Sequence, residues 1–140
     1  MIERIFAAKK ENIEVMLSFV EEALERAGCS VKMQTALCVA MEEAFVNVAD
    51  YAYPEGEGDA KISVDISPET GTAVFCISDK GIAFNPLQKA DPELTVPAQQ
   101  REIGGLGIFI IKKTMDSVEY SRENGENRLI MTKKLERNIQ

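Results

Sequence analysis

Apolar positions recur at intervals of three and four residues in the first part of the chain, which is the spacing of amphipathic helices. The pattern predicts one helix from residue 11 to Gly28, whose glycine would end it. It predicts a second, longer helix over residues 31–51, with Ser30 in position to cap its first turn. A short third helix is expected over residues 107–115.

Short apolar runs, several of them with a spacing of two, predict the strands. These strands are expected over residues 2–6, 61–66, 72–78, 118–122 and 128–135. The run over 72–78 is apolar on both faces, which is typical of a central strand. Turn sequences at Gly71 and at Asn124-Gly125 join strands into antiparallel hairpins.

The order of these elements is strand, helix, helix, hairpin, long loop, helix and hairpin. It predicts an α+β fold, a two-layer α/β sandwich in which helices cover one face of a mixed, mostly antiparallel sheet. The regular alternation of a doubly wound parallel fold is absent, and the glycines do not have P-loop spacing. No repeat or linker interrupts the pattern, so we expect one domain over residues 1–140.

Composition and charge narrow the class of protein. The chain has 140 residues, 45% of them hydrophobic, and a formal net charge of −7, which is typical of a folded domain. No basic run is longer than two residues, as at Lys9-Lys10 and Lys112-Lys113, which is too short to favour direct binding to nucleic acid. No apolar run approaches the ~18 residues of a membrane span, and the N-terminus lacks the pattern of a signal peptide. We therefore expect a cytoplasmic protein without a membrane partner.

The spacing of the cysteines and the absence of histidine exclude further kinds of chemistry. Cys29, Cys38 and Cys76 have no close pair spacing, and Cys38 and Cys76 fall in apolar segments, so we expect buried free thiols. The chain has no histidine. This excludes a histidine-based catalytic triad, a histidine metal ligand and phosphorylation of this chain on histidine.

Polar residues on the second predicted helix are candidates for function. Glu43 and Asn47 are four residues apart and share one face, which Asp50 and Tyr51 extend by one turn. A solvated stripe is one interpretation of this face. The other is a buried site, because the segment around these residues is apolar nearly all round, and polar groups on a buried helix need partners.

Two glycine-containing stretches on either side of a loop suggest a nucleotide site. Asp79 follows the central strand and begins the stretch over residues 79–84, and the glycine cluster over 104–107 begins the third predicted helix. The acid can accept hydrogen bonds from a base, glycines let the backbone approach a ligand, and a helix N-terminus offers unpaired N–H groups to phosphate. The loop over residues 85–103 contains prolines and little periodicity, as functional lids often do.

Three stretches of the chain resemble the motifs of one family. Glu42-Glu43-Ala44-Phe45-Val46-Asn47 resembles its N-box helix, Asp79-Lys80-Gly81-Ile82-Ala83-Phe84-Asn85-Pro86 its first glycine box, and Gly104-Gly105-Leu106-Gly107-Ile108-Phe109 its second. In the order and spacing of these motifs the chain resembles the histidine-kinase-like (GHKL, or Bergerat-fold) ATPases, and within them the anti-sigma-factor serine/threonine-protein kinases of RsbW type. The resemblance covers nearly the whole chain, and the absence of histidine fits it.

The resemblance implies ATP and Mg²⁺ as cofactors and gives roles to the motif residues. Glu43 would be the catalytic residue, which orients or deprotonates the attacking hydroxyl. Asn47 would coordinate Mg²⁺ through its side-chain oxygen, and Asp79 would accept a hydrogen bond from the adenine amino group. The residues expected to contact the nucleotide are Asn47, Asp50, Asp79, Gly81, Phe84, Arg101, Gly104, Gly105, Leu106 and Gly107.

Two positions depart from the family pattern. Tyr51 stands near the place where many members have a histidine soon after the N-box asparagine, and we interpret it as a packing or base-side residue. Arg101 lies slightly further before the second glycine box than the lid arginine of several relatives. Because of this shift, the resemblance makes Arg101 only a candidate contact to the γ-phosphate.

By the same resemblance the protein would be an ATP-dependent serine/threonine-protein kinase that regulates transcription. It would phosphorylate a STAS-domain anti-anti-sigma partner, sequester a sigma factor or similar regulator, and form a homodimer. The alternative is a non-catalytic ATP-binding module of the same fold, which senses nucleotide or binds a partner. The presence of both Glu43 and Asn47 favours the kinase, because a binding module has no need of the base.

Overall fold

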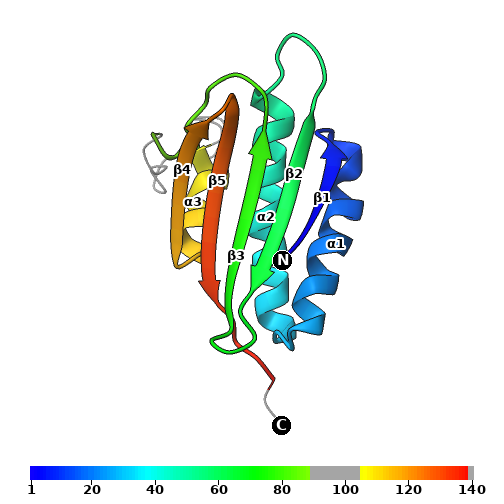
Figure 1. Ribbon diagram of the computed structural model, residues 1–140, viewed down its shortest axis with the longest axis vertical. Helices are drawn as coiled ribbons and strands as arrows, with labels where there is room; N and C mark the ends of the chain where they lie inside the picture. Colours follow the sequence, from blue (N-terminus) through cyan, green and yellow to red (C-terminus); the bar gives the residue numbers. More distant parts are fainter. Residues whose placement is uncertain (89–104, 139–140) are drawn as a thin grey trace.

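An antiparallel sheet with helices on one of its faces forms the protein (Figure 1). The computed structural model describes residues 1–88 and 105–138. The strands are β1 (Ile2–Ala7), β2 (Asp59–Ile66), β3 (Thr72–Asp79), β4 (Ser117–Glu123) and β5 (Glu126–Lys134). The helices are α1 (Ile13–Arg26), α2 (Val31–Tyr51) and α3 (Gly105–Thr114), and the short 3-10 turns are η1 (Lys10–Asn12) and η2 (Pro86–Gln88).

The strands lie in the order β1-β2-β3-β5-β4. In the part of the chain that the structure describes, each of the four pairings is antiparallel. All three α-helices lie behind the sheet in the view of Figure 1. The predicted α+β two-layer fold is confirmed, and β3 occupies the central position that its apolar residues indicated. The expectation of a mixed sheet is wrong for the described residues, because each strand there runs opposite to its neighbours.

The ends of the predicted elements agree with the structure to within a few residues. The first helix begins at Ile13, because the η1 turn takes up the residues before it. β3 continues to Asp79, so this carboxylate belongs to the last residue of the central strand. α3 begins at Gly105, which places this glycine and Gly107 in the first turn of the helix.

The core lies between the sheet and the helices. On α2 the side chains of Leu37, Ala40 and Ala44 are buried, whereas Ala36 is exposed and Met33 is only partly buried. On β3 the side chains that face the helices are fully buried, namely those of Ala73, Phe75 and Ile77.

Three further expectations can be compared with the structure. All three cysteines are free, with Cys29 and Cys38 buried and Cys76 partly exposed on the outer face of the sheet. Ser30 caps α2 as predicted, since its Oγ accepts a hydrogen bond from Met33 N at 3.3 Å. Within the described ranges, every helix is too short or too polar to cross a membrane.

The C-terminal end of α2 meets the sheet next to Asp79. The carbonyl oxygen of Ala52, which directly follows α2, accepts a hydrogen bond from Ile82 N at 2.9 Å. On the other side, the antiparallel register of β3 and β5 places Asp79 opposite Asn127. A helix end and two neighbouring strands therefore converge on the first glycine box.

Candidate functional site

One face of α2 carries the polar candidates at intervals of one turn. Glu43, Asn47 and Tyr51 follow each other at a spacing of four residues. Glu43 faces the start of α3, where a methyl group added at Gly107 would lie 2.7 Å from Glu43 Oε2. The first and third predicted motifs are therefore in contact, and the lack of a side chain at Gly107 leaves room for the Glu43 carboxylate.

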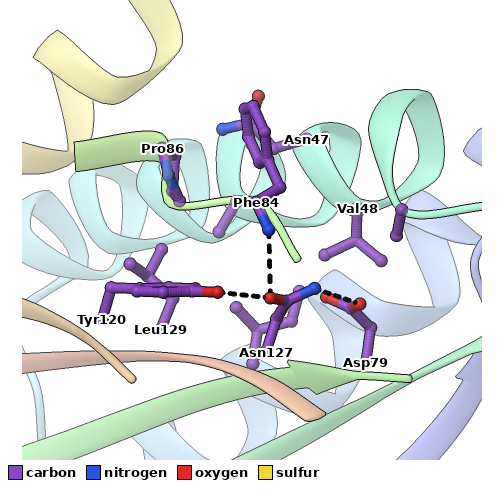
Figure 2. A pocket seen from close by; sticks show the side chains of 11 residues that line it. Asn47, Val48, Asp79, Phe84, Pro86, Tyr120, Asn127 and Leu129 are labelled. Atoms are coloured by element: carbon purple, nitrogen blue, oxygen red, sulfur yellow. Dashed lines mark hydrogen bonds between the residues drawn. The ribbon is translucent and has the colours of Figure 1, made fainter. Parts of the chain in front are cut away.

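A small cavity lies between α2 and the sheet, beside Asn47 (Figure 2). Its lining consists of Ala44, Asn47, Val48, Ala52, Ile77, Asp79, Phe84, Pro86, Tyr120, Asn127 and Leu129. Its volume is about 30 Å³, enough for about two water molecules. A nucleotide base is larger, so its entry would require the covering residues Phe84 and Pro86 to move.

Asp79 lines this cavity although the residue is only 7% exposed. Its Oδ1 accepts hydrogen bonds from Gly81 N and from Asn127 Nδ2, both at 2.9 Å. Among residues 1–88 and 105–138, no hydrogen-bond donor contacts the other oxygen of Asp79, Oδ2. Because Asp79 lines the cavity and only its Oδ1 is engaged, Oδ2 is an acceptor that a ligand can use.

Asn127 is a site residue that sequence reasoning missed. Its amide binds Asp79, the carbonyl oxygen of Ile82, the backbone N–H of Phe84 and the hydroxyl of Tyr120. Figure 2 shows the amide between Asp79 and Tyr120 on the sheet side of the cavity. One feature of the sequence could have indicated this residue. Asn127 is polar, although it lies at an inward-facing position of a strand whose next inward-facing positions are apolar.

Asn47 lines the cavity from the helix side. Its Nδ2 atom is buried and has no hydrogen-bond partner among the described residues. Buried polar atoms in folded proteins are nearly always paired, and an exception calls for an explanation such as a ligand. The structure therefore brings Asn47 and Asp79 to the same cavity, each with one polar atom available.

Glu43 is a half-buried carboxylate beside the start of α3. Burial raises the pKa of the Glu43 carboxyl above its ordinary value, and the negative charge of neighbouring Glu42 raises it further. Both effects disfavour the charged form. The carboxylate is consequently a stronger proton acceptor than an exposed glutamate, which suits a general base.

Gly81 permits a close contact between the first glycine box and α2. A methyl group at this position would collide with the backbone carbonyl of Ala52. The same carbonyl accepts the hydrogen bond from Ile82 N. Gly81 thus lets the turn after β3 pack directly against the end of α2, and this packing holds the Gly81 N–H that binds Asp79.

Two other candidates on α2 have different surroundings. Asp50 forms an ion pair with Lys10 of η1 at 3.1 Å and does not line the cavity. Tyr51 stacks on Phe84, with ring centroids 5.3 Å apart. The stacking agrees with the interpretation of Tyr51 as a packing residue, and it holds Phe84 over the cavity.

The second glycine box is described only in part. Gly105, Leu106 and Gly107 form the first turn of α3, where backbone N–H groups have no partner within a helix. Arg101 and Gly104 lie outside the described residues, as does the predicted lid beyond the η2 turn. The expectations for these residues stay predictions.

Sequence comparisons relate the chain to one family along almost its whole length. The family described as "Histidine kinase-like ATPase domain" matches residues 6–133. A serine-protein kinase RsbW from Listeria monocytogenes serotype 4a (strain HCC23) is 31% identical over 130 residues, which cover 90% of this chain and 82% of the relative. The serine-protein kinase RsbW of Halalkalibacterium halodurans is 31% identical over 140 residues, with 97% and 84% covered. The serine/threonine-protein kinase BtrW of Bordetella bronchiseptica is 26% identical over 116 residues, with 83% and 81% covered.

Solved structures have the same fold at low sequence identity. A structure of the RsbU and RsbW domains of a Mycobacterium tuberculosis protein has a TM-score of 0.65 at 12% identity. The match covers 100% of this chain and 34% of that one, so this chain spans about a third of the solved chain. The Acinetobacter baumannii histidine kinase AdeS has a TM-score of 0.52 at 15% identity, with 96% and 68% covered. At these identities the likeness shows the fold alone.

Proposed function

Because this chain belongs to the histidine kinase-like ATPase family, in the group of the RsbW serine-protein kinases, we propose that it is an ATP-dependent protein serine/threonine kinase of the anti-sigma-factor type. Residues 1–140 form one ATPase domain in this proposal. The protein transfers phosphate to a STAS-domain anti-anti-sigma partner and, in another state, binds a sigma factor or similar regulator. It works in the cytoplasm as a homodimer.

The convergence of three polar groups carries this proposal. Asp79 and Asn47 line one cavity, and Asp79 Oδ2 and Asn47 Nδ2 have no partner among the described residues. Glu43 lies one helical turn before Asn47, against the first turn of α3. In this proposal Asp79 binds the adenine, Asn47 the metal ion and the start of α3 the phosphates, while Glu43 accepts the proton, and their closeness supports phosphoryl transfer.

Each group has a role in the proposed reaction. Asp79 accepts a hydrogen bond from the adenine amino group and orients the base. The N–H groups at the start of α3 bind the phosphates. Glu43 accepts the proton of the partner's serine or threonine hydroxyl while the hydroxyl oxygen bonds to the γ-phosphorus and the bond to the β-phosphate oxygen breaks, releasing ADP.

The residues present also fit a magnesium ion. Mg²⁺ takes oxygen ligands, few of them from protein and the others from phosphates and water. The Asn47 amide has a buried end without a partner in the described ranges, and a half-turn of the amide would present its oxygen at the same place. Asn47 would hold the ion, which when bound neutralises charge on the phosphate oxygens.

Transfer of labelled phosphate from ATP to candidate STAS-domain proteins tests the proposal. We expect the wild type to phosphorylate its partner. Glu43→Gln keeps the size and the hydrogen-bonding oxygen but removes the base, so transfer should fall about 10²–10⁴-fold while nucleotide affinity is retained. Glu42→Gln is the matched control, because this neighbouring carboxylate points about 100° away around the helix. It should retain most of the activity.

The outcomes separate the kinase from its alternative. Full activity of folded Glu43→Gln would remove the catalytic role of this residue. ATP binding by a wild type that phosphorylates no candidate partner would favour the non-catalytic ATP-binding module. Absence of nucleotide binding by the wild type would contradict both functions.

A further inference from the structure

Asn127 uses its whole hydrogen-bonding capacity at the candidate site. Its Nδ2 donates to Asp79 Oδ1 at 2.9 Å and to the carbonyl oxygen of Ile82 at 2.7 Å. Its Oδ1 accepts from Phe84 N at 3.2 Å and from the Tyr120 hydroxyl at 2.5 Å. An amide has two donor hydrogens and two acceptor directions, so these contacts occupy all of them. The residue is 6% exposed, and its amide is held in one orientation.

This arrangement decides which oxygen of Asp79 is available. Oδ1 already accepts hydrogen bonds from Asn127 and from Gly81 N. Rotation of the carboxylate would break both bonds inside a buried site, where lost hydrogen bonds are costly. Oδ2 therefore remains as the acceptor that Asp79 offers to a ligand in the cavity.

The same amide also shapes the turn after β3. It binds Ile82 through a donor and Phe84 through an acceptor, so both ends of this short segment are tied to β5. Asn127, Tyr120 and Phe84 line the cavity together with Asp79. The network is thus part of the cavity wall, and a change in it alters the surface that a ligand meets.

We propose that Asn127, supported by Tyr120, is a positioning residue that fixes Asp79 so that the site selects a base with an exocyclic amino group. The inference rests on the proposed nucleotide-binding function and adds the residue that sets its base selectivity. Asn127 does not bind the base itself, because its amide is saturated. It acts by holding the Asp79 carboxylate with Oδ2 as the remaining acceptor.

Tyr120 provides a milder change in the same network. It lies on β4, next to β5, and its hydroxyl donates to Asn127 Oδ1. Tyr120→Phe removes one of the four contacts of the amide and leaves the ring in the cavity wall. Asn127→Ala removes all four. The two variants thus weaken the support of the Asp79 carboxylate to different degrees, and both leave Asp79 itself in place.

The test compares two ligands that differ only in the amino group. Affinities for ADP and for purine riboside 5′-diphosphate, which lacks this group, are measured calorimetrically in the presence of Mg²⁺. We expect the wild type to prefer ADP by about 10- to 100-fold, as for loss of one hydrogen bond to a buried charged group. In Asn127→Ala this preference should fall about fivefold or more, and in Tyr120→Phe it should fall by less.

A control separates positioning from general loss of stability. Ser30→Ala removes the cap at the opposite end of α2 and should lower the melting temperature without changing the ligand preference. An asparagine with a purely structural role would behave in the same way. A changed preference in Asn127→Ala together with an unchanged one in Ser30→Ala is therefore the result that supports positioning.

The remaining outcomes each support or overturn a stated claim. If the wild type prefers ADP and the folded variants keep that preference, the positioning role is wrong and the proposed function stands. If Asn127→Ala does not fold, an unchanged preference in Tyr120→Phe overturns the positioning role, and a reduced one supports it. If the wild type binds neither ligand, the proposed function fails and the positioning role fails with it.

Discussion

The two carboxylates of the site have different surroundings. Asp79 is held by two hydrogen-bond donors at one oxygen, whereas Glu43 lies against a glycine and beside a second acid. Burial and the like charge of Glu42 both raise the pKa of the Glu43 carboxyl. The surroundings therefore suit Asp79 for accepting a hydrogen bond from a ligand and Glu43 for accepting a proton.

The raised pKa of Glu43 predicts the pH dependence of phosphoryl transfer. The base is active as the carboxylate, so activity should fall as the pH drops through the pKa of Glu43, which lies above that of an ordinary glutamate because of burial and, secondly, Glu42. Glu42→Gln removes the like charge, and the acidic limb of the rate profile should then move to lower pH. Single-turnover rates across the acidic range would measure this, and an unmoved limb would show that Glu42 has no influence on the base.

The unpaired amide of Asn47 predicts a magnesium-dependent effect. Asn47→Ala should weaken binding of Mg²⁺-ATP more than binding of ATP in the presence of a chelator, because only the former would use the amide oxygen. Titrations with and without magnesium measure the two affinities. Equal losses under both conditions would mean that Asn47 supports the cavity wall and does not bind the ion.

At the scale of elements, α2 places the candidate groups along one line. Glu43 lies against α3, Asn47 at the cavity and Tyr51 on Phe84. The end of the helix then binds the turn after β3 through the carbonyl of Ala52. One helix therefore contacts both glycine boxes, and its rise of about 1.5 Å per residue sets their separation along its axis.

The contact between this turn and α2 predicts the effect of Gly81→Ala. The added methyl group would collide with the backbone of Ala52, and backbone cannot rotate away as a side chain can. We expect a loss of about 1–3 kcal/mol in the free energy of unfolding, as for other overpacked positions, together with weaker nucleotide binding. Chemical denaturation measures the first effect and calorimetry the second.

Gly56→Ala is the matched control for this substitution. Gly56 lies in the exposed turn after α2, and no described atom lies within 4 Å of a methyl group placed there. It should change neither stability nor binding by a measurable amount. A Gly81→Ala protein as stable as Gly56→Ala would contradict the packing argument.

Local pattern was enough to predict the elements and part of the site. Helical and strand periodicities depend on neighbouring residues, and Glu43, Asn47 and Asp79 lie in short motifs. Asn127 could not be found in this way, because its partners Phe84 and Asp79 lie 43 and 48 residues away in the chain. Their contact depends on the register of β3 and β5, and a slip by one residue would turn Asn127 to the other face of the sheet.

At the scale of the whole molecule, the candidate site joins the two layers of the fold. Asp79 and Asn127 belong to neighbouring strands, Asn47 belongs to α2, and α3 supplies the helix start. A ligand that binds all of these groups holds the sheet and the helices together. The unfolded chain does not present them in one place, so such a ligand stabilises the folded state alone.

This linkage predicts that nucleotide raises the thermal stability of the protein. With Mg²⁺-ADP at about 100 times its dissociation constant, the folded state gains about 2.7 kcal/mol, which for a chain of this length corresponds to a rise of about 8 °C in melting temperature. Asp79→Asn should show a much smaller rise at the same ligand concentration, since the acceptor for the amino group is altered. Differential scanning calorimetry measures both shifts.

Asp116→Asn is the matched control for Asp79→Asn. Asp116 is also a hydrogen-bonded aspartate, but it accepts from Lys134 N and pairs with Lys133 at the far end of α3. The donors of Lys134 and Lys133 lower the pKa of Asp116, so its substitution should reduce the melting temperature of the ligand-free protein and leave the ligand-induced rise intact. A rise that is equally large in Asp79→Asn would show that this carboxylate does not contact the nucleotide. If the melting temperature of the wild type does not change at any nucleotide concentration, the cavity between α2 and β3 is not a nucleotide-binding site.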